Sequence, residues 1–224
     1  MKKYIILDFG KVLAYPVTGD WFITPLFLKL IDMTKIDKEE LLKLMGNYND
    51  ILSRSATTLE EEYDIFYDFY KNVLNDINYP VTEDTIHLLA HDITYNDNKY
   101  EFYDNIDEEL EQLSKKYILI LLSDNWPCAF HIMKNRGIDK FFKKMYISSV
   151  YEVQKKDGIF FDYPINDFNI KEGEAIFVDD NEKLLDVGVT KGLEVRLMDR
   201  DGKNNQSKYR IINNLEQINE YENS

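Results

Sequence analysis

Five short apolar runs constrain the fold of this 224-residue chain more than any other feature. They span Tyr4–Leu7, Tyr117–Leu122, Met145–Ile147, Ala175–Val178 and, less regularly, Glu194–Leu197. Apolar character that is nearly continuous, rather than alternating with polar residues, is typical of strands that are covered on both faces. Strands of this kind belong to a sheet that lies between two layers of helices.

Amphipathic segments separate the later runs. Cys128–Asn135 has a helical pattern with Gly137 as its stop, and Glu182–Lys191 has another, which ends at Gly192. Strands that alternate with helices predict an α/β fold, and right-handed crossovers make its sheet parallel. We therefore expect a Rossmann-like parallel sheet core.

A long segment between the first two strands, residues 17–95, carries almost no strand signal. A capping box at Thr58–Glu61 starts one predicted helix, and amphipathic helices are also predicted over Asp37–Leu52 and Thr82–Asp92. A helical block of this length is too long for a simple crossover between two strands. We expect an inserted helical subdomain at residues 17–98 and a core domain made of residues 1–16 plus 99–224.

Composition and charge narrow the classes of partner. With 44% hydrophobic and 30% charged residues, the chain can bury a sizeable core and is not expected to be disordered. A formal charge of −14 disfavours nucleic acids and anionic membranes as partners, because both carry negative charge. The sequence makes no prediction of the oligomeric state.

Cysteine content and the N-terminal segment bear on the compartment. The single cysteine, Cys128, excludes an intramolecular disulfide and is compatible with a reducing compartment. No signal peptide or membrane span follows Met1-Lys2-Lys3. We expect a cytoplasmic protein.

Polar residues stand where predicted strands end. Asp8 follows the first run, Ser123 the second and the pair Asp179-Asp180 the fourth, while Lys155 lies a short way after the third. In open α/β sheets, ligands bind in the crevice at the carboxyl ends of the strands. A set of strand-end groups in this order indicates a phosphoryl-transfer site.

Four motifs together resemble those of the haloacid dehalogenase-like (HAD) superfamily. They are Asp8-Phe9-Gly10-Lys11-Val12-Leu13, the run Ile118–Leu122 followed by Ser123-Asp124-Asn125, Lys155-Lys156-Asp157, and Ile176-Phe177-Val178-Asp179-Asp180-Asn181. Each motif alone is weak, but their order and spacing cover nearly the whole chain outside the helical insert. The insert is similar to the α-helical cap that many members carry after the first strand.

The resemblance implies a role for each of these residues. Asp8 would be the nucleophile that forms an aspartyl-phosphate, and Ser123 and the backbone N–H of Asp124 would bind the phosphoryl group. Lys155 would neutralise charge on that group, with Lys156 as a weaker alternative. The implied cofactor is Mg²⁺, held by Asp8, Asp180 and the carbonyl of Gly10, with Asp179 acting directly or through water.

Elementary electrostatics agrees with a bound cation. Asp8, Asp179 and Asp180 would repel one another at one sheet edge, so a positive charge is needed between them. Mg²⁺ accepts carboxylate, carbonyl, water and phosphate oxygens as ligands.

Two positions depart from the family pattern. Gly10 stands where most members have a second aspartate, which protonates the leaving group and later activates water. General acid–base assistance is typically worth about 10²–10⁴ in rate, so turnover is expected to be slow, to use another proton donor, or to prefer substrates with good leaving groups. Asp124 stands where many members have asparagine, and we expect its side chain to point away from the phosphate.

The predicted function is a Mg²⁺-dependent phosphatase that acts on a small phosphomonoester, such as a sugar or nucleotide phosphate. One alternative is a non-catalytic or weakly active relative that binds a metal or a phosphometabolite, because Gly10 removes the general acid. The other is a 2-haloacid dehalogenase-type hydrolase, which uses a carboxylate nucleophile without a metal. The intact Asp179-Asp180 pair argues against the dehalogenase.

Overall fold

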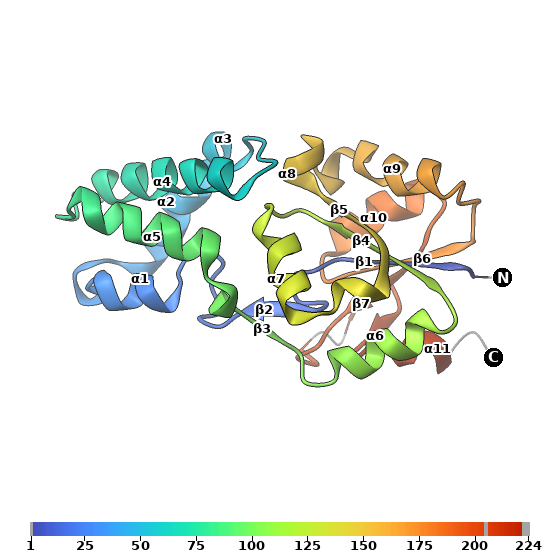
Figure 1. The fold of residues 1–224 in the computed structure, drawn as a ribbon. Coiled ribbons are helices and arrows are strands. Elements are labelled where there is room, and N and C mark those ends of the chain that lie inside the picture. Colours follow the sequence, from blue (N-terminus) through green and yellow to red (C-terminus); the bar gives the residue numbers. More distant parts are fainter. Residues whose placement is uncertain (1, 204–205, 221–224) are drawn as a thin grey trace. The chain divides into compact units, whose positions relative to one another are not determined.

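The computed structural model describes residues 2–203 and 206–220 (Figure 1). The chain divides into two compact units. The core unit comprises residues 1–15, 102–125 and 129–224, and the helical unit comprises residues 16–101 and 126–128.

The core unit is built on a six-stranded sheet in the order β5-β4-β1-β6-β7-β8, and neighbouring strands are parallel. The strands are β1 Tyr4–Leu7, β4 Ile118–Ser123, β5 Phe142–Ile147, β6 Ala175–Asp179, β7 Glu194–Met198 and β8 Ile211–Ile212. The predicted α/β fold is confirmed. The third predicted strand begins three residues earlier than expected, because exposed Lys143 and Lys144 interrupt the apolar pattern of an edge strand.

Helices cover both faces of this sheet (Figure 1). On one face, Ile6, Ile120 and Phe177 pack with Phe160 and Phe161 in a single buried cluster. Side chains alternate along a strand, so Ile5 and Leu7 point to the opposite face, where they are also fully buried. The helices are α6 Ile106–Ser114, α7 Cys128–Arg136, α8 Ser148–Tyr151, α9 Ile159–Asp167, α10 Glu182–Thr190 and α11 Gln217–Glu220, with 3₁₀ turns at Asp139–Phe141 and Lys155–Asp157.

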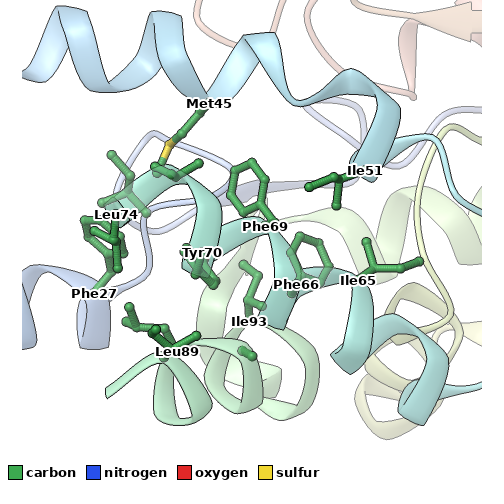
Figure 2. Close-up of a cluster of buried hydrophobic side chains, with 14 of the residues drawn as sticks. Phe27, Met45, Ile51, Ile65, Phe66, Phe69, Tyr70, Leu74, Leu89 and Ile93 are labelled. Atoms are coloured by element: carbon green, nitrogen blue, oxygen red, sulfur yellow. The ribbon is translucent and has the colours of Figure 1, made fainter. Parts of the chain in front are cut away.

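The helical unit has a hydrophobic core of its own. Figure 2 shows Phe66, Phe69 and Tyr70 of one long helix surrounded by apolar side chains from the others. The predicted capping box is present, since the Thr58 hydroxyl accepts from the Glu61 N–H while the Glu61 carboxylate accepts from the Thr58 N–H. The helices are α1 Pro25–Leu30, α2 Lys38–Asn47, α3 Asn49–Leu52, α4 Leu59–Asp76 and α5 Glu83–Tyr95, with 3₁₀ turns at Met33–Lys35 and Asp97–Lys99.

One helix prediction in this unit is wrong in its extent. The segment Asp37–Leu52 was expected to form a single helix, but it is interrupted at Tyr48, whose ψ of 34° leaves the helical region. The Asn49 amide donates to the Gly46 carbonyl at 2.8 Å, which satisfies a carbonyl at the end of α2. A glycine and two asparagines around the break lower the helix propensity there.

A short two-stranded sheet joins β2 Ala14–Pro16 to β3 Tyr100–Phe102. Sequence patterns did not predict it, because three-residue strands are too short to show a period. None of the described helices is long and apolar enough to cross a membrane.

The packing of the helical unit predicts that two adjacent leucines of α5 differ sharply in their contribution to stability. Leu89 is fully buried in the cluster and Leu88 is 51% exposed. Leu89→Ala should lower the free energy of unfolding by about 2–5 kcal/mol, and Leu88→Ala should change it by less than about 0.5 kcal/mol. Urea denaturation of both variants measures the difference. Equal losses would contradict the described packing.

Candidate active site

Asp8 lies at the centre of the carboxyl edge of the sheet. It directly follows Leu7 of β1, which pairs with Leu121 of β4 on one side and Val178 of β6 on the other. The Asp8 N–H continues this ladder by donating to the Val178 carbonyl at 3.1 Å. Asp8 is therefore fixed beside Asp179, and it is only 7% exposed.

Lys155 inserts its ammonium group between two of these carboxylates. Its Nζ atom lies 2.9 Å from Asp8 Oδ1 and 2.6 Å from Asp179 Oδ2. Burial alone would lower the pKa of Lys155, but the carboxylates of Asp179, Asp8 and Asp124 raise it above the ordinary value. The lysine therefore stays protonated and supplies a fixed positive charge. Lys156 is exposed and makes neither contact.

A cluster of carboxylates suited to a metal ion surrounds this lysine. Asp8, Asp179 and Asp180 each offer an oxygen, and these oxygens lie within 4.8 Å of one another. Burial and the neighbouring Asp8 raise the pKa of both Asp179 and Asp180, although Lys155 opposes the shift at Asp179 and Lys11 opposes it at Asp180. The cluster thus holds more negative charge than its lysines offset.

The carboxylates differ in how much of their bonding capacity is used. Both Asp179 oxygens already accept, one from Lys155 Nζ and the other from the Asn181 N–H at 2.9 Å. Asp8 Oδ1, in contrast, is buried and accepts no hydrogen bond of good geometry despite its proximity to Lys155. Asp8 and the half-exposed Asp180 therefore fit a hard divalent cation as direct ligands, and Asp179 fits better as the anchor of Lys155.

The loop after β4 is braced from two directions. Asp124 Oδ1 accepts the backbone N–H of Lys155 at 2.9 Å, which is how this chain uses the carboxylate that replaces the usual asparagine. The Asn125 N–H donates to Ser148 Oγ at 3.0 Å. Ser123 ends β4 and is 1% exposed. These contacts fix the backbone around the predicted phosphate-binding residues.

Two residues of the site were missed by the sequence analysis. Lys11 places its ammonium 3.3 Å from Asp180 Oδ2, and Ser148 supports the loop after β4. Ser148 directly follows β5, as Asp8 follows β1, so the strand-end rule could have found it. Lys11 does not directly follow a strand, so the same rule could not have found it. Its left-handed φ of 54° belongs to the turn around Gly10.

The raised pKa values predict how stability depends on pH and Mg²⁺. The folded state binds protons at Asp179 and Asp180 more tightly than the unfolded state does, so their contribution to stability is full below pH 4 or so and is lost as the pH rises through the folded-state pKa. In EDTA, Tm should fall between about pH 5 and 8, and Mg²⁺ should restore it increasingly over that range.

Differential scanning fluorimetry with and without Mg²⁺ measures this dependence. Asp180→Asn should flatten it, whereas Asp162→Asn, whose partner Lys191 lies outside the cluster, should keep the wild-type slope. The same slope in all three proteins would contradict the repulsion within the cluster.

The fold is shared with several solved structures. The HAD protein YfnB from Bacillus subtilis, bound to magnesium, has a TM-score of 0.69 at 14% identity, over 98% of this chain and 97% of that one. L-2-haloacid dehalogenase from Xanthobacter autotrophicus, with chloropropionic acid covalently bound, has a TM-score of 0.70 at 12% identity, over 100% and 99%. A HAD family enzyme from Bacteroides thetaiotaomicron, in complex with magnesium and inorganic phosphate, has a TM-score of 0.64 at 18% identity, over 92% and 98%.

Sequence comparison identifies the family. No curated protein matches the sequence. The haloacid dehalogenase-like hydrolase family matches residues 5–198, which contain all four motifs and the helical insert. The chain therefore belongs to the haloacid dehalogenase-like hydrolase family.

Proposed function

We propose that this protein is a Mg²⁺-dependent phosphatase that hydrolyses a small phosphomonoester, such as a sugar or nucleotide phosphate. The observation that carries the proposal is the contact of one buried ammonium with two carboxylates. Lys155 lies 2.9 Å from Asp8 and 2.6 Å from Asp179, and Asp180 completes an oxygen cluster beside them. A nucleophile, a fixed cation and a metal-binding set are the parts that phosphoryl transfer requires.

Asp8 has the properties of the nucleophile. A carboxylate oxygen of Asp8 would attack phosphorus, and the ester oxygen would leave with the bonding electron pair. The product is an aspartyl-phosphate, and water then attacks its phosphorus to release phosphate and restore the carboxylate. The backbone bond from Asp8 N–H to Val178 keeps the attacking group in register with the sheet.

The other residues hold and neutralise the transferring group. We assign the Ser123 hydroxyl and the Asp124 N–H as donors to phosphoryl oxygens, and Lys155 as the cation that offsets their charge. Bound through Asp8, Asp180 and the Gly10 carbonyl, Mg²⁺ would act as a Lewis acid on a phosphoryl oxygen. The donor set supports this choice of ion, because all of its atoms are oxygens.

Gly10 makes this a phosphatase without the usual proton donor. An alkyl leaving group must then take its proton from water or substrate, whereas an aryl leaving group needs little assistance. We expect aryl phosphates to turn over faster than alkyl phosphates by about 10²–10⁴. The helical unit is proposed as the cap that selects the substrate.

The relatives leave a second reaction class open on the same scaffold. A haloacid dehalogenase uses its carboxylate to displace halide from carbon, and L-2-haloacid dehalogenase shares this fold. The crowding of Asp8, Asp179 and Asp180 favours the metal-dependent reaction instead. These three carboxylates outnumber the two lysines that contact them, and a metal ion would offset the remaining negative charge.

Phosphate release from an aryl phosphate and a panel of sugar and nucleotide phosphates tests the proposal. Wild-type protein should be active with Mg²⁺ and inactive in EDTA, and Asp8→Asn should fall to background while Asp162→Asn stays active. Mg²⁺ binding without turnover on any substrate would indicate the non-catalytic alternative. Halide release from a 2-haloacid in EDTA would indicate the dehalogenase.

A further inference from the structure

The chain turns sharply after the nucleophile, in a segment that we call the nucleophile loop, residues 9–14. Within it the Lys11 N–H donates to Ala14 O at 2.7 Å, and the Leu13 and Ala14 N–H groups both donate to Phe9 O, at 2.9 and 3.2 Å. Lys11 adopts the left-handed φ of 54° that the turn requires. A non-glycine residue in this conformation strains the turn, and contacts from outside the loop help to hold Gly10 in one orientation.

Arg200 provides a contact of this kind from a distant part of the chain. Its Nε and Nη2 atoms both donate to the Val12 carbonyl, at 3.1 and 2.9 Å. Val12 is fully buried and lies two residues after Gly10. The guanidinium also lies over the ring of Tyr103, 4.7 Å from its centroid. The Val12 carbonyl therefore accepts from two N–H groups of one buried guanidinium.

Glu109 makes it possible to bury this guanidinium. Arg200 Nη1 and Nη2 donate to the two Glu109 oxygens at 2.9 and 2.7 Å, in a bidentate pair. The Arg200 side chain is 7% exposed and the Glu109 side chain 3%. A buried charge without a partner is costly, so the carboxylate is what allows Arg200 to reach the loop.

We infer that Arg200, held by Glu109, is a positioning residue for the nucleophile loop, which fixes the backbone between Asp8 and Ala14 and with it the Gly10 carbonyl. The expected effect on catalysis rests on the proposed function, whereas the effect on the backbone of the loop does not. Four donor interactions are directed at two acceptor groups, a geometry that the three donors of a lysine cannot reproduce.

The first test measures backbone protection and needs no activity. In Arg200→Met, hydrogen exchange at the Leu13 and Ala14 amides should accelerate by at least about tenfold, because the Val12 carbonyl loses the two N–H donors of Arg200. Arg196→Met is the matched control, since Arg196 is also a buried arginine but contacts Val195 and Glu194 rather than the loop. Equal exchange of these amides in both variants would overturn the inference.

The second test separates positioning from stability. Both Arg200→Met and Arg196→Met should have a lower Tm than the wild type. Only Arg200→Met should also have a kcat on an aryl phosphate that is reduced by about 10–100-fold, with little change in KM. Arg200→Lys should recover part of kcat, and Glu109→Gln should lose it to a similar degree as Arg200→Met. Should Arg200→Met not fold, the comparison of Arg200→Lys with Arg196→Lys carries the same readouts.

The outcomes distinguish this inference from the proposed function. A wild-type protein without phosphatase activity, in which Arg200→Met still loosens the Leu13 and Ala14 amides, refutes the function and keeps the positioning role. An active wild type in which Arg200→Met keeps both full kcat and normal exchange refutes the positioning role alone.

Discussion

The ion contacts of Lys155 are the constraint on which the rest of the site depends. Three carboxylates meet at one sheet edge, and the buried Lys155 ammonium among them offsets the repulsion between Asp8 and Asp179 at close range. Asp124 in turn fixes the backbone of Lys155. The parallel sheet sets the distances, because Asp8 and Asp179 end adjacent strands in register.

The three aspartates of the cluster are alike in sequence but differ in their contacts. Asp179 is fully used in holding Lys155 and the Asn181 N–H, so it acts as a support. Asp8 retains an oxygen without a good hydrogen bond, and Asp180 is more exposed than Asp179. Two adjacent aspartates thus meet different surroundings, because Asp179 ends β6 and is buried, whereas Asp180 lies just beyond the strand and contacts Lys11. In the proposed reaction, Gly10 leaves proton transfer without a side chain.

The sequence predicted the fold well where the physical signal was long and periodic. Continuous apolar strands identified the parallel sheet, and the Thr58–Glu61 capping box placed the start of α4 correctly. It missed the break at Tyr48, where a local side-chain contact follows the end of α2, and the strands β2 and β3, which are too short to show a period. In the site, the rule that functional side chains stand where strands end identified Asp8 and Asp179, the carboxylates that contact Lys155. Arg200 and Glu109 could not be found in that way, because they lie 91 residues apart and neither carries a local pattern.

Rapid-quench mass spectrometry of the peptide that contains Asp8 tests whether Asp8 accepts the phosphoryl group during turnover. With Gly10 in place of a residue that activates water, breakdown of the aspartyl-phosphate should be slower than its formation from an aryl phosphate. We therefore expect an initial burst of phenol, and a phosphoryl group on Asp8 in the same time range. Release of phosphate with no burst and an unmodified Asp8 would contradict it.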